Sequence, residues 1–591
     1  MRLYSIFTAV YRRWLAILLA LTTAIALISC NLVSLKTAPA SVSQLVFSSP
    51  IFPKTFNPAL AQAEADTLNF TSEGLVGENS QGGVEPYLAE AWEISENSQR
   101  IIFTLRKGLR WSDGVALTAD DVLFTYNDVY LNEAIPTDAR DLLKIGKNQA
   151  LPTIRKLDEL RVEFSLPEPF TPFLRTTRLP ILPEHALKES VNTKDAEGKP
   201  KFLSTWGIDT PPEKIIVNGP YKIEAFTASE RIIFRKNPYY WRKDAQGNSQ
   251  PYIKRVIRQI VDNTGTSLIQ FRSGGLHYID VPSEYFSLLK REEKRGKFTI
   301  YNGGSSGFMT FVSFNLNKGI RNGKPIVDPI KSRWFNTLEF RQAIAYAIDR
   351  QQMLNNIFRG LGNLQNSSFP VQSPEYLSPK EGLKVYDYNP QKAKELLVKA
   401  GFKYTSTGQL LDSEGNLVRF TLMTNAGNKI REPMAAQIKR NLSQIGIQVD
   451  LNPLANSLFL DKIFNSWDWE FLLFGNSATM EPNDLANVWL PESSWHYFNR
   501  KPSKGQPLIV GHEVAEWEQK IGDLYIQGAR ELDAVKRKAI YAETQRIAQE
   551  YLPFIYIVNP FAMAAVRNHI HNIKFSAVAG AFWNVYELKL K

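Results

Sequence analysis

The chain has 591 residues, of which 44% are hydrophobic and 22% are charged, a composition that excludes a disordered chain and a polytopic membrane protein. At about 150 residues per domain, this length predicts several lobes rather than one small core. The net charge of +11 comes from 70 basic and 59 acidic residues that are interspersed without a basic stripe. It therefore favours a solvated surface near an anionic membrane over nucleic-acid binding.

The first thirty residues are the strongly apolar part of the chain. The run 14–28 follows Arg12 and Arg13, and at about 1.5 Å per residue it is too short to cross a hydrocarbon core of about 30 Å. We therefore expect a cleaved signal peptide over residues 1–29, followed by a flexible tether over residues 30–44. The sequence LISC at 27–30 resembles a bacterial lipobox, which implies lipidation of Cys30; a cleaved signal with an incidental cysteine is the alternative.

A compact unit is predicted between residues 85 and 129. Residues 101–105 are β-branched and aromatic and predict a strand, and the dipeptide Asp113-Gly114 predicts a turn. Thr118 is a good helix N-cap, and the acidic pair 120–121 lies in the first helical turn, where the helix dipole favours negative charge. We interpret this acidic pair as a cap rather than an acid/base dyad.

Further elements follow in chain order. The alternating segment 160–166 predicts a half-buried strand, and the Gly-rich segment 301–317 predicts one strand that crosses a hinge, because paired glycines can absorb backbone rotation. Apolar spacing predicts an Ala-rich helix over 340–350. The order strand, helix, strand over 420–424, 431–444 and 447–451 predicts parallel strands and an α/β lobe. Helices are also predicted at 263–273, at 390–400 with Gly401 as its C-cap, and through 513–550.

Several of these segments share sequence motifs with a known protein family. The segments are PYLAEAWEIS at 86–95, FTLRKGLRWSDGVALTADDV at 103–122, NGPYKI at 218–223, FRQAIAYAIDR at 340–350 and DYNPQKAKELL at 387–397. They resemble the extracytoplasmic solute-binding proteins of ABC transporters, of the oligopeptide, dipeptide and nickel-binding type (family 5). The resemblance implies an α/β, two-lobed periplasmic-binding-protein fold of the large type. It assigns 45–75, 206–312 and 561–591 to lobe I, 76–205 to an extra subdomain of that lobe, and 313–560 to lobe II.

The same resemblance implies the function. The chain would capture oligopeptides or peptide-like solutes between two lobes and deliver them to ABC permease and ATPase subunits, as a monomer without a cofactor. Lipidation at Cys30 would hold it at the periplasmic or cell-surface face of the bacterial cytoplasmic membrane. The same role for an oligosaccharide or a metal chelate is the alternative.

The residues themselves indicate no enzyme. The sequence contains no phosphate-binding loop, no HExxH and no GxSxG, and His569 and His571 have no third metal ligand nearby, so we predict neither catalytic residues nor a metal site. Two rivals stay open: a lipid-anchored hydrolase that uses Glu481 and Asp484 as a carboxylate pair, and a purely structural envelope protein.

The segment 467–495 is the candidate ligand site. A buried strand leads into a Gly/Asn/Ser loop that can place backbone donors and acceptors against an extended ligand. Trp467 and Trp469 are interpreted as packing residues. The resemblance places this loop in the cleft. The expected ligand-binding residues are Phe474, Gly475, Asn476, Ser477, Ala478, Thr479, Glu481, Asp484, Trp489 and Trp495.

One position departs from the family pattern. Peptide-binding members carry an acidic residue four positions ahead of the loop proline, where it pairs with the α-ammonium group of the peptide. In this chain the loop proline is Pro482 and the residue four positions ahead is Ala478. Either Glu481 or Asp484 replaces that acid, or the ligand has a blocked or absent amino terminus.

Overall fold

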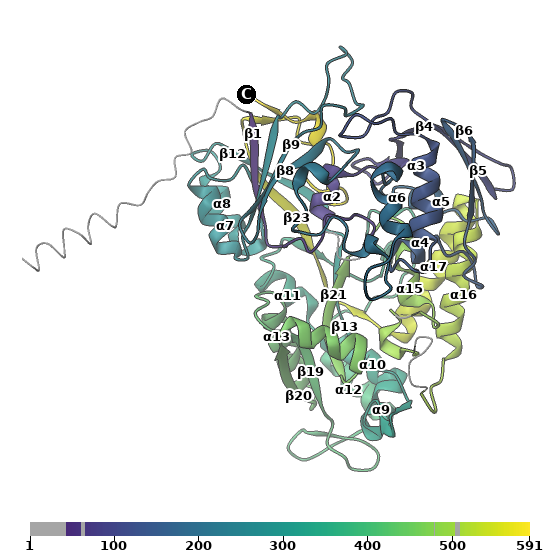
Figure 1. The fold of residues 1–591 in the computed structure, drawn as a ribbon. Coiled ribbons are helices and arrows are strands. Elements are labelled where there is room, and N and C mark those ends of the chain that lie inside the picture. Colours follow the sequence, from purple (N-terminus) through teal and green to yellow (C-terminus); the bar gives the residue numbers. More distant parts are fainter. Residues whose placement is uncertain (1–42, 61–64, 478, 494, 503–508) are drawn as a thin grey trace, which may run out of the picture. The chain divides into compact units, whose positions relative to one another are not determined.

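The computed structural model describes residues 43–60, 65–477, 479–493, 495–502 and 509–591, and Leu45–Lys591 forms one compact unit. Its largest described sheets have eight, five and four strands, with helices between them in the chain (Figure 1). The predicted signal peptide, Cys30 and nearly all of the tether lie outside the described residues. Within the described residues, no helix is both long and apolar enough to cross a membrane.

The first sheet has eight strands and joins segments from both ends of the unit. Its order is β12 (Phe298–Ser305), β23 (Val558–Arg567), β11 (Tyr278–Asp280), β1 (Gln44–Ser49), β10 (Arg255–Ile260), β9 (Arg231–Lys236) and β8 (Tyr221–Thr227), and β16 (Gly362–Leu364) pairs with β23. Strands β1 and β11 are parallel. Helices α7 (Thr264–Arg272) and α8 (Ser283–Glu292) pack against this sheet through a small apolar cluster that includes Phe271 and Leu289.

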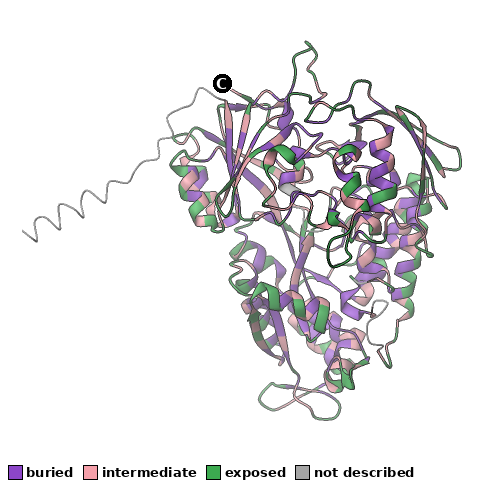
Figure 2. Cartoon of the chain, in the orientation of Figure 1, coloured by how far each residue is buried: buried purple, intermediate pink, exposed green. Residues whose placement is uncertain are grey.

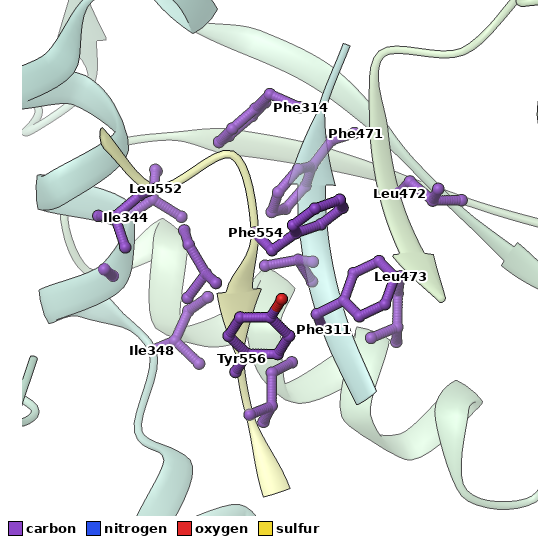
Figure 3. Packing of buried hydrophobic residues seen from close by; sticks show 14 of the residues in the cluster. Phe311, Phe314, Ile344, Ile348, Phe471, Leu472, Leu473, Leu552, Phe554 and Tyr556 are labelled. Carbon is purple, nitrogen blue, oxygen red and sulfur yellow. The ribbon is translucent and has the colours of Figure 1, made fainter. Parts of the chain in front are cut away.

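The second sheet has five strands and a large aromatic core. Its order is β20 (Gln448–Leu454), β19 (Arg419–Asn425), β21 (Phe471–Ser477), β13 (Phe308–Phe314) and β22 (Ile555–Tyr556). The parallel pairing of β19 with β20, joined by α13 (Arg431–Ser443), confirms the predicted strand, helix, strand unit. Phe314 stacks on Phe471 with ring centroids 4.1 Å apart (Figure 3). Six of the seven residues of β13 are buried, so helices and side chains cover both of its faces (Figure 2).

The third sheet lies in the predicted extra subdomain. It is antiparallel in the order β4 (Ala89–Ile94), β5 (Arg100–Leu105), β7 (Arg161–Ser165) and β6 (Thr153–Asp158). Helix α3 (Ala119–Leu123) begins with a capping box in which Thr118 bonds the first turn and the side chain of Asp121 bonds the backbone of Thr118. The predicted strand, turn and cap are therefore confirmed.

Two short segments join the first and second sheets. One is Ser306–Gly307, between β12 and β13, and the other is Ile557, between β22 and β23. The backbone N–H of Ser306 donates to the carbonyl of Pro560 at 2.8 Å, so the two crossings lie side by side. The prediction of one continuous strand over 301–317 is wrong. Two strands in different sheets share this segment, because the backbone pairs with different partners on either side of Gly307.

The helices around the second sheet match the predicted periodicity with shifted ends. Helix α10 (Leu338–Ala347) ends earlier than predicted, because Asp349 caps a new helix, α11 (Arg350–Asn356). Helix α12 (Pro390–Lys399) begins at a capping Asn389 and is followed by Gly401 at φ = 90°, as predicted. The predicted helical region 513–550 contains two helices, α16 (Glu516–Arg530) and α17 (Ala534–Tyr551).

The remaining helices and strands are short. They are α2 (Ala65–Thr71), α4 (Ala139–Leu143), α5 (Phe173–Thr176), α6 (Glu184–Asn192), α9 (Pro329–Asn336), α14 (Asn456–Asp461), α15 (Ala486–Trp489), β2 (Val76–Glu78), β3 (Val84–Pro86), β14 (Ile320–Arg321), β15 (Lys324–Pro325), β17 (Lys403–Tyr404), β18 (Leu410–Leu411), β24 (Ile570–His571) and β25 (Lys589–Leu590).

Candidate functional site

A cavity of about 730 Å³ lies where the ends of the second sheet meet segments of the first-sheet and third-sheet regions. Residues 306–308 contribute from the second-sheet side, together with Ser477, Thr479 and Met480. The other side contributes residues 68–69, 72–74, 76–78, 178–180, 577–579, 583 and 585–586, together with Tyr87, Pro220, Pro370 and Gln372. Because these segments are far apart in the sequence, only the folded chain brings them together.

The ends of two paired strands form the second-sheet wall of the cavity. Phe308, the first residue of β13, is the register partner of Ser477, the last residue of β21, and both line the cavity. A Cβ atom at Gly475 would lie 2.6 Å from the carbonyl oxygen of Met309 and 2.8 Å from the Phe308 ring. Glycine at this position therefore lets the Phe308 ring lie against β21. The expected Gly/Asn/Ser loop at 475–477 is part of this strand, so the loop begins later than predicted.

Arg431 lies behind this wall, and none of the described carboxylates forms an ion pair with it. Its guanidinium is 5.7 Å from the centre of the Phe308 ring and 5.2 Å from that of Phe474. One nitrogen donates to the side-chain oxygen of Asn425 at 2.9 Å. Burial lowers the pKa of Arg431 to about 10. The two aromatic rings and the amide hold this cation in place of an acid.

The loop that follows β21 is held by its own polar side chains. The Thr479 hydroxyl donates to Asp484 Oδ2 at 2.6 Å, and the Glu481 carboxylate accepts from the backbone N–H of Asn483 at 3.0 Å. Asp484 also lies 3.5 Å from a guanidinium nitrogen of Arg178. This ion pair connects the loop to the segment 178–180 on the opposite wall of the cavity.

Glu481 is directed away from the cavity, into a buried ion cluster on α17. Its Oε1 is 2.5 Å from Arg537 Nη2, and Arg537 also bonds to Glu375. Burial raises the pKa of the Glu481 carboxyl, and the charge of Arg537 lowers it by a smaller amount. Asp484 bonds to Thr479 and Arg178 instead, so the two carboxylates have different partners.

Another buried carboxylate, Glu73, backs the first-sheet side of the cavity. It accepts from the Tyr240 hydroxyl at 2.6 Å and from the Trp241 indole at 2.7 Å, with Arg242 Nε at 4.0 Å. The Arg242 guanidinium in turn lies 4.3 Å from the centre of the Tyr586 ring and 4.4 Å from that of Trp241. Aromatic rings and ions therefore make this wall a fixed, interlocked surface.

The structure separates the expected site residues into groups. Ser477 and Thr479 line the cavity, and Asp484 bonds to Thr479. Phe474, Gly475 and Asn476 lie on β21 and Glu481 lies in the ion cluster, none of them lining the cavity, while Ala478 lies outside the described residues.

Two tryptophans expected in the cleft lie elsewhere. Trp489 is 2% exposed and stacks on Tyr525 of α16 with ring centroids 6.1 Å apart, so it belongs to the core. Trp495 is 44% exposed and lines a separate cavity of about 190 Å³, to which Asp484 also contributes. Trp467 and Trp469 are buried, as predicted.

Sequence reasoning missed most of the aromatic lining. Tyr87, Phe308, Trp583 and Tyr586 all line the cavity, and Gln372 contributes an amide. Tyr87 lies inside the motif 86–95, but that motif alone indicates only a strand and the residues that lead into it. No local pattern marks the other residues, because they converge from distant parts of the chain.

Within the described residues, no group of three or more His, Cys, Asp and Glu side chains could hold a metal ion. His569 packs against His277 with ring centroids 5.0 Å apart, and His571 lies on β24.

Comparisons with known proteins agree with this geometry. The sequence pattern described as "Bacterial extracellular solute-binding proteins, family 5 Middle" matches residues 83–497. A "Probable ABC transporter-binding protein" of Deinococcus radiodurans is 28% identical over 529 residues, which is 85% of this chain and 84% of that protein.

Solved structures show the same fold. The oligopeptide-binding protein AppA from Bacillus subtilis, in complex with a nonapeptide, matches with a TM-score of 0.72 at 22% identity, over 93% of this chain and 99% of its own. The periplasmic binding protein MelB from Agrobacterium fabrum, in complex with stachyose, matches with a TM-score of 0.74 at 19% identity, over 93% of this chain and 85% of its own. The predicted two-lobed α/β fold is therefore confirmed.

Proposed function

Because this chain belongs to the bacterial extracellular solute-binding proteins of family 5, we propose that it is the receptor of an ABC importer that captures peptides or peptide-like solutes between its two lobes. It passes the solute, chemically unchanged, to permease and ATPase subunits in the membrane. It acts as a monomer, and a lipid on Cys30 holds it at the outer face of the bacterial cytoplasmic membrane. Several acyl chains on one cysteine make such attachment effectively permanent.

The observation that carries this proposal is the cavity shared by the two sides of the molecule. Ser477 and Thr479 line it from the second-sheet side, while Tyr87 and Tyr586 line it from the first-sheet side. A solute in this cavity contacts both sides when the lobes are closed and only one side when they are open. These additional contacts are what allow a ligand to shift the population toward the closed state.

A substitution that fills the cavity tests the proposal. Ser477 is exposed at the end of β21, so Ser477→Trp places a large ring in the cavity without removing a core contact. We expect solute affinity to fall by at least about tenfold, which corresponds to about 1.4 kcal/mol. The measurement is isothermal titration with a peptide library, alongside the thermal shift that each peptide produces.

The matched control is Thr227→Trp, at the exposed end of β8 and outside the cavity lining. It should leave both the affinity and the unfolding temperature unchanged. Unaltered binding in Ser477→Trp would place the solute somewhere else. A wild-type protein that binds no peptide but does bind a sugar or a metal chelate would refute the peptide part of the proposal.

An oligosaccharide is the second candidate solute. Tyr87, Trp583 and Tyr586 line one side of the cavity, and aromatic faces of this kind can pack against sugar rings as well as against peptide side chains. A tetrasaccharide titrated beside the peptide library distinguishes the two candidates. Identifying the small molecules that co-purify with the native protein provides an independent answer.

A further inference from the structure

The charged groups of the cavity wall are already paired with one another. Glu78 lies 2.7 Å from Arg175 and 2.8 Å from Arg178. Arg178 also reaches Asp484, whose carboxylate accepts from Thr479. These two acids and two guanidiniums therefore form one ion-paired cluster that spans the cavity.

Glu73, on the first-sheet side of the cavity, also has its partners within the protein. Glu73 accepts from Tyr240 and Trp241, and Arg242 is the nearest cation to it. Burial raises the pKa of the Glu73 carboxyl, which disfavours its ionised form. The guanidinium of Arg242 lies against the rings of Tyr87, Trp241 and Tyr586, so it too has its contacts within the wall.

Each charged residue that lines the cavity among the described residues has an oppositely charged partner. Glu73 has Arg242, Glu78 has Arg175 and Arg178, and Arg178 has Glu78 and Asp484. The other described lining residues are apolar, aromatic or neutral and polar, for example Leu179, Phe308, Met480, Val578 and Trp583. A charged group of the solute would enter this space without a counter-ion, and burying an unpaired charge is strongly unfavourable.

A neutral hydrogen-bond acceptor is free in the same wall. The Gln372 side chain lines the cavity, and its Nε2 donates to the carbonyl of Ser305 at 2.5 Å. Its Oε1 is buried and has no hydrogen-bond partner among the described residues. A buried acceptor without a partner is costly, so a donor on the solute, such as an amide N–H or a hydroxyl, would complete it.

We infer that the solute is electrically neutral where it occupies this cavity, as in a peptide with blocked ends, a cyclic peptide or a neutral oligosaccharide. This inference rests on the proposed receptor function and specifies its solute. The cavity recognises the shape, the apolar surface and the hydrogen-bond donors of the solute rather than its terminal charges.

Matched peptides test the inference directly. One neutral sequence of about five residues is prepared with free ends, with an acetylated amino end, with an amidated carboxyl end and with both ends blocked; a neutral tetrasaccharide is titrated in parallel. We expect the doubly blocked peptide to bind at least tenfold more tightly than the free peptide. Equal or tighter binding of the free peptide overturns the inference while the receptor function stands.

The remaining outcomes separate the two proposals. Binding of the tetrasaccharide with no binding of any peptide supports a neutral solute and refutes the peptide proposal. Binding of a charged metal chelate, with none of the neutral ligands bound, overturns the neutral solute. If none of these ligands binds, both the proposed function and the inference fall.

A variant that removes one cation from the ion pairs of the cavity wall should shift the binding preference toward the peptide with free ends. In Arg178→Gln, Glu78, which lines the cavity, keeps only Arg175 as its cation, and Asp484 keeps only Thr479 as its partner, so the wall gains net negative charge. We expect the ratio of free-peptide to blocked-peptide affinity to rise at least tenfold relative to wild type. Arg272→Gln is the matched control, because Arg272 pairs with Glu292 between α7 and α8, outside the cavity lining. An unchanged ratio in Arg178→Gln would contradict the inference.

Discussion

His277 joins the first strand of the described unit to its last long strand. Its Nδ1 accepts a hydrogen bond from the backbone N–H of Val46 in β1 at 3.0 Å, and its ring packs against that of His569. Burial, followed by the neighbouring His569 and Arg567, lowers the pKa of His277 to about 4. A protonated Nδ1 could not accept this bond, so the fold requires the neutral ring.

This requirement makes stability depend on pH. Between about pH 6.5 and pH 4 the unfolded chain protonates His277 while the folded chain does not, so the unfolded state binds more protons. We expect the free energy of unfolding to fall by up to about 3 kcal/mol as the pH drops through this interval. Urea denaturation at several pH values measures it.

The variant His277→Asn keeps an acceptor near the position of Nδ1 but cannot be protonated. Its loss of stability from pH 6.5 to pH 4 should be smaller than that of the wild type, since the difference between the two proteins isolates this ring from all other titrating groups. Parallel pH profiles for the two proteins would show that His277 does not carry the effect.

At the scale of the element, α17 supports the loop that follows β21. Arg537 on this helix binds both Glu481 of the loop and Glu375, and its Nε donates to the carbonyl of Gly528 on α16. All three ionic side chains are buried. Thr479, two residues before Glu481, lines the cavity, so a helix outside the cavity lining supports a residue within it.

Removing the cation of this cluster should lower the free energy of unfolding. Arg537→Met leaves two buried carboxylates without their partner, and we expect a loss of about 3–5 kcal/mol in the free energy of unfolding. Glu481→Gln should cost much less, because it removes a charge while Arg537 keeps Glu375. Arg546→Met, on the exposed face of the same helix, should be nearly neutral. Similar urea midpoints for Arg537→Met and Arg546→Met would contradict this account.

At the scale of the whole molecule, two short backbone crossings between described strands connect the first and second sheets. Ser306–Gly307 and Ile557 pass between them and are tied by the hydrogen bond from Ser306 to Pro560. The proposed receptor cycle needs movement at such crossings. Attachment through the proposed lipid on Cys30 does not depend on this movement, because residues 30–44 precede nearly all of the fold.

Anchoring and solute binding should therefore be separable. In Cys30→Ser expressed in a bacterial host, we expect the protein to leave the membrane fraction, while its purified form binds solute as tightly as the wild type. Cell fractionation and mass spectrometry of the mature amino terminus measure the two forms. Membrane retention of Cys30→Ser would refute lipidation at this residue.

The sequence by itself determined the features that depend on neighbouring residues. The capping of α3 by Thr118, the positive φ of Gly401 after α12 and the parallel unit of β19, α13 and β20 follow from local chemistry and periodicity. The family could also be identified, because its motifs are short continuous segments. Within the expected site, Ser477 and Thr479 were accessible to the same reasoning, because both lie at the end of a strongly apolar strand.

Only the tertiary structure decided which side chains share the cavity. Tyr87, Gln372 and Trp583 come from segments hundreds of residues apart, and no periodic pattern records that they meet. Trp489 shows the reverse case, since its polar neighbours suggested a cleft but Tyr525 of a later helix covers it. The pairing of charges around the cavity is likewise a property of distances between remote residues, and local sequence carries no signal for such distances.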